Sequence, residues 1–260
     1  MKELPLKIFY IFSSPILTAF LLSYAAAFIF IATLASSQMG IAQMQAQFIE
    51  SWAAVFHFEA AGLDIFIPLI GGKTIGVLAL ANIAAAALRF TRRNIEGFGF
   101  AMVHAALALL IVSGFLQGKW RMEGAMEIQK GEPATAVYKM EGGKKFLLAT
   151  LPFSVELKNF ERQNYKNSDI AKGYSSLVEF RYAGKKIEKL ISMNEPASFG
   201  AWTFYQSSYA RGGETSILMA VKNPAGLLPT VSIALILIGM AFTYAVKIFK
   251  KSDEKVRNNS

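Results

Sequence analysis

Four long apolar stretches dominate the sequence and restrict the chain to folds that place them in a lipid bilayer. They cover residues 14–35, 70–89, 97–117 and 227–248. Each is close to the roughly 20 residues that an α-helix needs to cross the hydrocarbon core. The chain is 53% hydrophobic and only 17% charged, whereas soluble proteins carry about 25% charged residues. We therefore expect a multi-pass membrane protein with four transmembrane helices.

Basic residues form three clusters beside these stretches. They are Lys2, Lys7, Arg89, Arg92, Arg93, Lys247, Lys250, Lys251, Lys255 and Arg257. Segment 36–63 contains no Lys or Arg. Cytoplasmic loops carry an excess of Lys and Arg, so we expect both termini and the 89–96 loop in the cytoplasm. Segments 36–69 and 118–226 then lie outside the plasma (inner) membrane. This clustering beside the apolar stretches also argues against a nucleic-acid partner for the net charge of +9.

The large segment between the third and fourth stretches has the pattern of β-strands. Phe153, Val155 and Leu157 alternate with polar residues, which is typical of a half-buried strand. Ala183-Gly184 and Gly142-Gly143 lie between such runs and predict hairpin turns. Seven or eight short strands in about 108 residues suit a β-sandwich-like domain.

The predicted organisation has three parts. Residues 1–118 form a membrane domain with three transmembrane helices and an interfacial segment at 39–58, where apolar and polar residues mix as in an amphipathic helix on the outer membrane surface. Residues 119–226 form an extracytoplasmic β-rich domain. Residues 227–260 form the fourth transmembrane helix and a basic cytoplasmic tail. The fold class is thus an α + β membrane protein whose β domain is inserted between the third and fourth helices.

The sequence offers few groups for chemistry. It has no cysteine and two histidines, which excludes disulfides and covalent haem attachment to this chain and makes a protein-only zinc site improbable. No phosphate-binding loop or nucleophile elbow is present. The apolar stretches contain no paired carboxylates, which argues against a proton-coupled transporter. We identify no catalytic residue.

His104 is the candidate site residue, because an ionisable group inside a membrane helix is a functional-site hypothesis by default. It could ligate a metal or haem, relay protons or bind quinone, or simply form a hydrogen bond to Asn82 or a backbone carbonyl. Gly97, Ala101 and Ala105 share a helix face beside it, and small residues allow a neighbouring helix to approach. His57 lies among aromatic residues near the outer surface and is interpreted as a membrane anchor.

An ordered set of short matches resembles the ResB-like family, also called CcsB, of System II cytochrome c biogenesis. The matches are Ser14-Pro15, Leu17-Thr18, Ile31-Ala32-Thr33, Gly71 to Gly76, Asn82, Arg89-Phe90, His104, Ser113-Gly114, Glu123-Gly124, Met126, Leu151 to Phe153, Val155, Phe160, Asn194 to Pro196 and Gly200 to Tyr209. Together they run along nearly the whole chain. No single one of them is specific, but their order is.

The resemblance implies a function in haem delivery. Family membership implies a CcsA-type haem-handling partner in the membrane, with which such a chain moves haem outward and joins it to apocytochrome c. His104 matches the third-span histidine that is implicated as an axial ligand of haem b, held transiently and shared with the partner. The chain would then be a non-catalytic subunit of a cytochrome c haem lyase (synthase) complex. The alternatives are an electron-transfer or quinone-binding membrane subunit and a structural assembly scaffold. The chain departs from the family pattern in being short and not fused to its partner.

Overall fold

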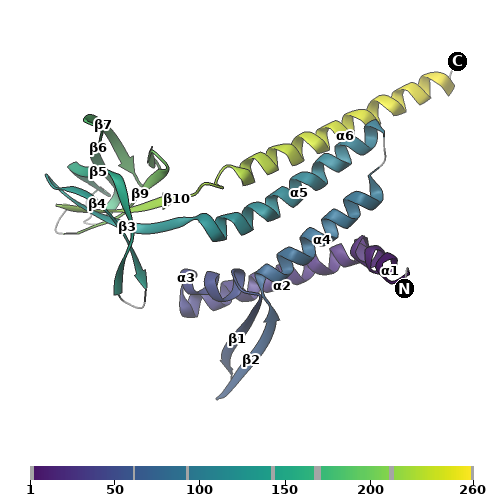
Figure 1. Cartoon of the computed structure of the whole chain (residues 1–260), viewed down its shortest axis with the longest axis horizontal. Coiled ribbons are helices and arrows are strands. Elements are labelled where there is room, and N and C mark those ends of the chain that lie inside the picture. Colours follow the sequence, from purple (N-terminus) through teal and green to yellow (C-terminus); the bar gives the residue numbers. More distant parts are fainter. Residues whose placement is uncertain are drawn as a thin grey trace. The chain divides into compact units, whose positions relative to one another are not determined.

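The computed structural model describes residues 3–60, 62–91, 94–141, 144–166, 171–210 and 214–258. The chain divides into two compact units, Met1–Gly118 with Gly226–Ser260, and Lys119–Ala225. The first unit is mainly helical and the second is a β-sheet, as the element labels in Figure 1 show.

Within the described residues, the helical unit contains four helices that are long and apolar enough to cross a membrane, in agreement with the four apolar stretches. They are α2 (Pro15–Met39), α4 (Gly72–Phe90), α5 (Ile95–Trp120) and α6 (Leu228–Asn258). The shorter helices are α1 (Glu3–Phe12), α3 (Ile41–Met44) and the π-helical turn η1 (Gln45–Ile49). Helix α2 begins where expected, because the Ser14 side chain accepts a hydrogen bond from the Ile16 amide and proline occupies the first helical position.

Asn82 joins α4 to the break between α1 and α2. Its Nδ2 donates to the Phe12 carbonyl at 2.6 Å, and its Oδ1 accepts from the Thr18 hydroxyl at 2.8 Å. The Asn82 side chain is buried. These bonds satisfy its side-chain NH2 and C=O groups, and also an otherwise free carbonyl at the end of α1. Asn82 therefore links helices, and among the described residues its hydrogen bonds go to Phe12, Ser14 and Thr18 and not to His104.

The expected amphipathic helix over 39–58 is wrong in its second half. Residues 53–60 form strand β1 (Ala53–Ala60), which pairs antiparallel with β2 (Leu63–Ile70). Alternating residues of β1 point to opposite faces of the hairpin. Near its tip, His57 Nε2 lies 2.8 Å from Asp64 Oδ1, within hydrogen-bond distance. The base of this hairpin is held by Gly71 and Gly72, where a Cβ atom would collide with the backbone of Ser51 and Ile49.

The second unit is an antiparallel sheet with the order β7-β6-β5-β4-β3-β10-β9-β8. Its strands are β3 (Met122–Gln129), β4 (Pro133–Glu141), β5 (Lys144–Asn164), β6 (Ala171–Tyr182), β7 (Lys185–Ser192), β8 (Ala197–Phe199), β9 (Trp202–Ala210) and β10 (Thr215–Lys222). A β-sandwich of two sheets was expected, whereas the described strands form one continuous sheet.

This sheet curls so that strands far apart in its order enclose a common core. Phe180 of β6 stacks on Phe199 of β8 with ring centroids 4.7 Å apart. Ser176 of β6 donates to Gln206 of β9 at 2.7 Å in the same interior. One sheet thereby buries its own inner face, which is the packing that a sandwich obtains from two sheets.

The strand predicted from Phe153, Val155 and Leu157 is confirmed, because all three side chains are buried in that core. The Ala183-Gly184 turn is also confirmed: both residues have positive φ, and β6 and β7 pair directly up to it. The Gly142-Gly143 turn lies outside the described residues.

Candidate functional site

His104 lies on α5, and one of its ring nitrogens is held by its own helix. Nδ1 is 3.0 Å from the carbonyl oxygen of Phe100. A carbonyl can only accept, so in the neutral ring Nδ1 carries the proton and Nε2 keeps its lone pair. This is the arrangement by which proteins prepare a histidine to bind a metal through the other nitrogen. The Phe100 ring, whose centroid is 3.9 Å from that of His104, restricts the imidazole further.

Helix α6 packs closely against α5 beside this histidine. A Cβ atom on Gly99 would collide with the Thr243 hydroxyl, and a Cβ on Gly239 would lie 2.8 Å from Val103 and 3.2 Å from the Gly99 carbonyl. The helices therefore meet at their backbones, as small residues permit in membranes. The α5 residues at this crossing are Gly99, Met102 and Val103, whereas the predicted small-residue face consists of Gly97, Ala101 and Ala105.

An open cleft of about 220 Å³ lies between these two helices at His104. Its lining is mostly apolar and consists of Phe100, Val103, His104, Met240, Thr243, Tyr244 and Lys247. Complete ligand pockets have volumes of roughly 300–1,000 Å³. The cleft therefore suits one edge of a larger flat ligand whose remainder extends beyond this pair of helices.

Sequence reasoning found His104 and missed the side chains of α6 that share the cleft. Lys247 was assigned only to the basic cytoplasmic end of the last span, and Tyr244 was not considered. A signal does exist, because Met240, Tyr244 and Lys247 recur at intervals of four and three residues and so share one helix face.

His57 is placed elsewhere in the helical unit, in the β1–β2 hairpin. It pairs with Asp64, and its ring stacks on Phe66 with centroids 4.6 Å apart. It does not line the cleft. Across the described ranges, no group of three or more His, Cys, Asp or Glu side chains could hold a metal ion, so a metal at His104 would need other donors.

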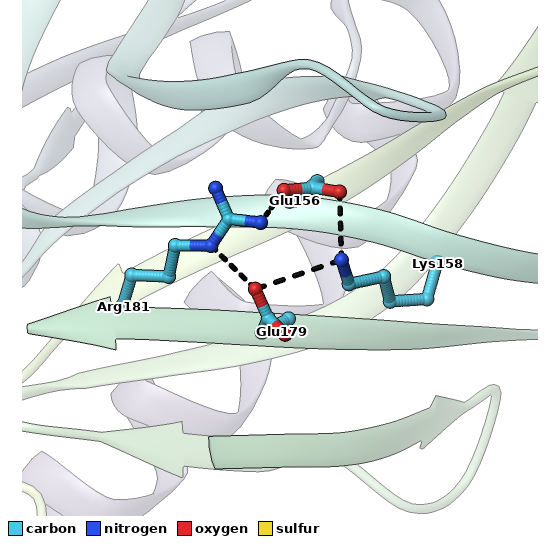
Figure 2. Close-up of polar contacts among 4 residues, drawn as sticks. All are labelled: Glu156, Lys158, Glu179 and Arg181. Atoms are coloured by element: carbon cyan, nitrogen blue, oxygen red, sulfur yellow. Dashed lines mark hydrogen bonds and ion pairs between the residues drawn. The ribbon is translucent and has the colours of Figure 1, made fainter. Parts of the chain in front are cut away.

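A second polar cluster lies on the outer face of the sheet (Figure 2). Glu156 and Lys158 of β5 meet Glu179 and Arg181 of β6: Lys158 Nζ lies 2.8 Å from Glu156 and 3.6 Å from Glu179, and Arg181 contacts both carboxylates. The hydrogen bond from Arg181 lowers the pKa of Glu179 below its ordinary value, and the bond to Glu156 raises the pKa of Lys158. Two carboxylates and two cations balance each other here, so the cluster stabilises the sheet and offers no free charge to a ligand.

Comparison with known proteins identifies relatives of this chain. The sequence profile of the ResB-like family matches residues 90–254, more than half of the chain. Protein NrfI of Wolinella succinogenes is 33% identical over 92 residues, which are 35% of this chain and 10% of that protein. Cytochrome c biogenesis protein CcsB of a Picosynechococcus species is 29% identical over 152 residues, 54% of this chain and 31% of that protein. The chain thus spans less than a third of the length of either relative.

Among solved structures, the cytochrome c heme lyase CcmF resembles the chain slightly. The TM-score is 0.38 with 14% identity, over 66% of this chain and 30% of that chain. This likeness is too low to bear on either fold or function.

Proposed function

The chain belongs to the ResB-like family, and from this premise we propose that it is a subunit of a membrane complex that delivers haem and attaches it to apocytochrome c. One relative is named as a cytochrome c biogenesis protein. The four long apolar helices fit a multi-pass subunit of the plasma (inner) membrane. In this proposal the chain itself is non-catalytic, and it holds the cargo while a partner completes the site.

The observation that carries the proposal is the free Nε2 of His104 in an apolar cleft. Its Nδ1 is committed to the Phe100 carbonyl, so the lone pair of Nε2 is available to haem iron, for which imidazole is a common axial ligand. The aromatic and aliphatic lining suits a flat apolar macrocycle. The donor set of the cleft therefore fits haem b as cargo.

The openness and small volume of the cleft support a shared site. Across the described residues His57 is the second histidine, and it does not line the cleft. A second axial ligand would come from a CcsA-type membrane partner, which would also cover the remainder of the macrocycle. Binding is then transient, because the cargo moves on to apocytochrome c.

The distribution of basic residues supports the orientation of the proposed subunit. Both termini lie in the cytoplasm, and the curled sheet lies on the outer side, where haem is attached to apocytochrome c. The outer domain would hold apocytochrome c or shield the haem while the thioether bonds form.

Loss of the chain tests this proposal in cells. Deleting it should abolish covalent haem on a reporter c-type cytochrome and leave b-type cytochromes at their normal level, and the full chain supplied in trans should restore the reporter. A complex purified through the chain should be red and contain a second membrane protein. Normal maturation of the reporter in the deletion strain would refute the proposed function.

A further inference from the structure

The cleft at His104 has a charged end, formed by Lys247, to which the proposed function has so far given no role. Lys247 lines the cleft together with Tyr244, one turn away on α6. In the part of the chain that the structure describes, no carboxylate pairs with Lys247 and the Tyr244 hydroxyl donates to no acceptor. The Thr243 hydroxyl differs, because it already donates to the Gly239 carbonyl at 2.8 Å. Two donors are therefore available at one end of an otherwise apolar cleft.

Lys247 and His104 lie at different depths in the membrane, so the two ends of the cleft differ in their surroundings. Lys247 comes 19 residues after the start of α6 at Leu228, which places it about 28 Å along the helix. A hydrocarbon core is about 30 Å thick, so the ammonium reaches the interface at the end of the span. His104 comes nine residues after the start of α5 at Ile95, about 13 Å along that helix. The nitrogen donor thus lies deeper in the hydrocarbon than the cation.

We propose that Lys247, assisted by the Tyr244 hydroxyl, binds the carboxylate groups of the cargo and so fixes its orientation in the cleft. This inference rests on the proposed function, since it takes the cargo to be an iron porphyrin whose metal binds His104. A porphyrin with two carboxylates on one edge is apolar in its ring and anionic at that edge. The cleft has the same division, with its carboxylate-binding end at the interface where Lys247 lies. Lys247 and Tyr244 are positioning residues that select a cargo with free carboxylates.

Binding of two probes by the full chain in lipid nanodiscs tests the assignment. The probes are iron protoporphyrin IX and its dimethyl ester, which has the same ring and metal but no anionic carboxylates. Lys247→Ala should weaken binding of the free acid at least about tenfold, which corresponds to ~1.4 kcal/mol, and leave binding of the ester unchanged. Lys247→Arg should retain most of the affinity, and Tyr244→Phe should show a smaller loss. Lys250→Ala is the matched control, because Lys250 lies on the same helix and does not line the cleft.

The outcomes separate this inference from the function on which it rests. Unchanged binding of the free acid by Lys247→Ala, or an equal loss for both probes, overturns the role of Lys247. The first of these results would leave Lys247 as a contact for lipid phosphate. His104→Ala should weaken binding of both probes, and if it weakens neither, the haem site itself is refuted. Unchanged ester binding also shows that the cleft of the Lys247 variants is folded.

Discussion

Glu156 and Glu179 are direct register partners on neighbouring strands, and each residue is only 6% exposed. Like charges placed directly opposite in a sheet are destabilising. Lys158 and Arg181 remove that repulsion, because each contacts both carboxylates (Figure 2). The pairing of β5 with β6 thus depends on these two cations.

This dependence predicts a pH effect on stability. The pKa of Glu179 is lowered in the folded protein, mainly by Arg181. A lowered acid pKa stabilises the fold above the unfolded value of about 4.3, and this contribution is lost as the pH falls through the folded pKa. The melting temperature of the β-sheet unit should therefore fall as the pH drops below about 5, and less steeply in Glu179→Gln. A pH profile unchanged by Glu179→Gln would contradict the role of this ion pair.

Removing Arg181 should be more damaging than removing an exposed arginine. Arg181→Gln leaves two facing carboxylates with one cation, whereas Arg121 and Glu123 form an isolated pair in which both side chains are about 40% exposed. We expect Arg181→Gln to lower the melting temperature at pH 7 and Arg121→Gln to leave it nearly unchanged. Equal effects of the two substitutions would show that the cluster acts only as surface charge.

The register of β5 predicts where a charge is not tolerated. Val155 is fully buried between Ala134 and Phe180 in the paired strands. Val155→Asp should destabilise the domain by about 3 kcal/mol or more, because it buries an unpaired charge. Leu147→Asp is the control, since Leu147 is an exposed residue of the same strand. Denaturant unfolding measures both, and a stable Val155→Asp protein would contradict the register.

The close crossing of α5 and α6 predicts a difference between two glycines of one helix. Gly99 has no room for a Cβ atom, whereas nothing lies within 4 Å of a Cβ on Gly114. Gly99→Val should force the helices apart, destabilise the purified protein by about 1–3 kcal/mol and weaken haem binding. Gly114→Val should do neither. Thermal unfolding in detergent checks this prediction, and equal melting temperatures of the two variants would refute the close crossing.

The proposed orientation is tested by enzyme fusions. Alkaline phosphatase, which is active only outside the cytoplasm, should be active when fused after Lys222 and inactive when fused after Arg93. Active enzyme at the Arg93 junction would overturn the argument from the distribution of basic residues.

The sequence predicted those parts of the fold that depend on local pattern. The alternation around Val155 identified a strand, and the apolar stretches identified the long helices. The β1–β2 hairpin was missed because the polar residues before Phe56 suggested a helix. Phe56 and Phe58 do have the two-residue spacing of a strand. The structure of this segment is set by the pairing of β1 with β2, and the sequence of one strand alone does not reveal such a pairing.

The sites depend more strongly on tertiary contacts. The sequence pattern places Glu156 and Glu179 at solvent-facing positions of two strands, and only the register of β5 against β6 shows that they are neighbours. Lys247 lies 143 positions after His104 in the chain, and the antiparallel packing of α5 and α6 brings it to the same cleft. His104 could be singled out because a histidine in an apolar span is unusual by itself.

The central claim is that Nε2 of His104 ligates haem iron, and the haem spectrum of the purified complex tests it most directly. His104→Ala should preserve expression and assembly, abolish the haem absorbance and stop cytochrome c maturation, while His57→Ala, the matched control outside the cleft, should retain both. Added imidazole should partly restore the absorbance of His104→Ala, because it supplies the missing nitrogen donor. Full haem absorbance and normal maturation in His104→Ala would contradict the account and leave His104 as a packing residue of α5.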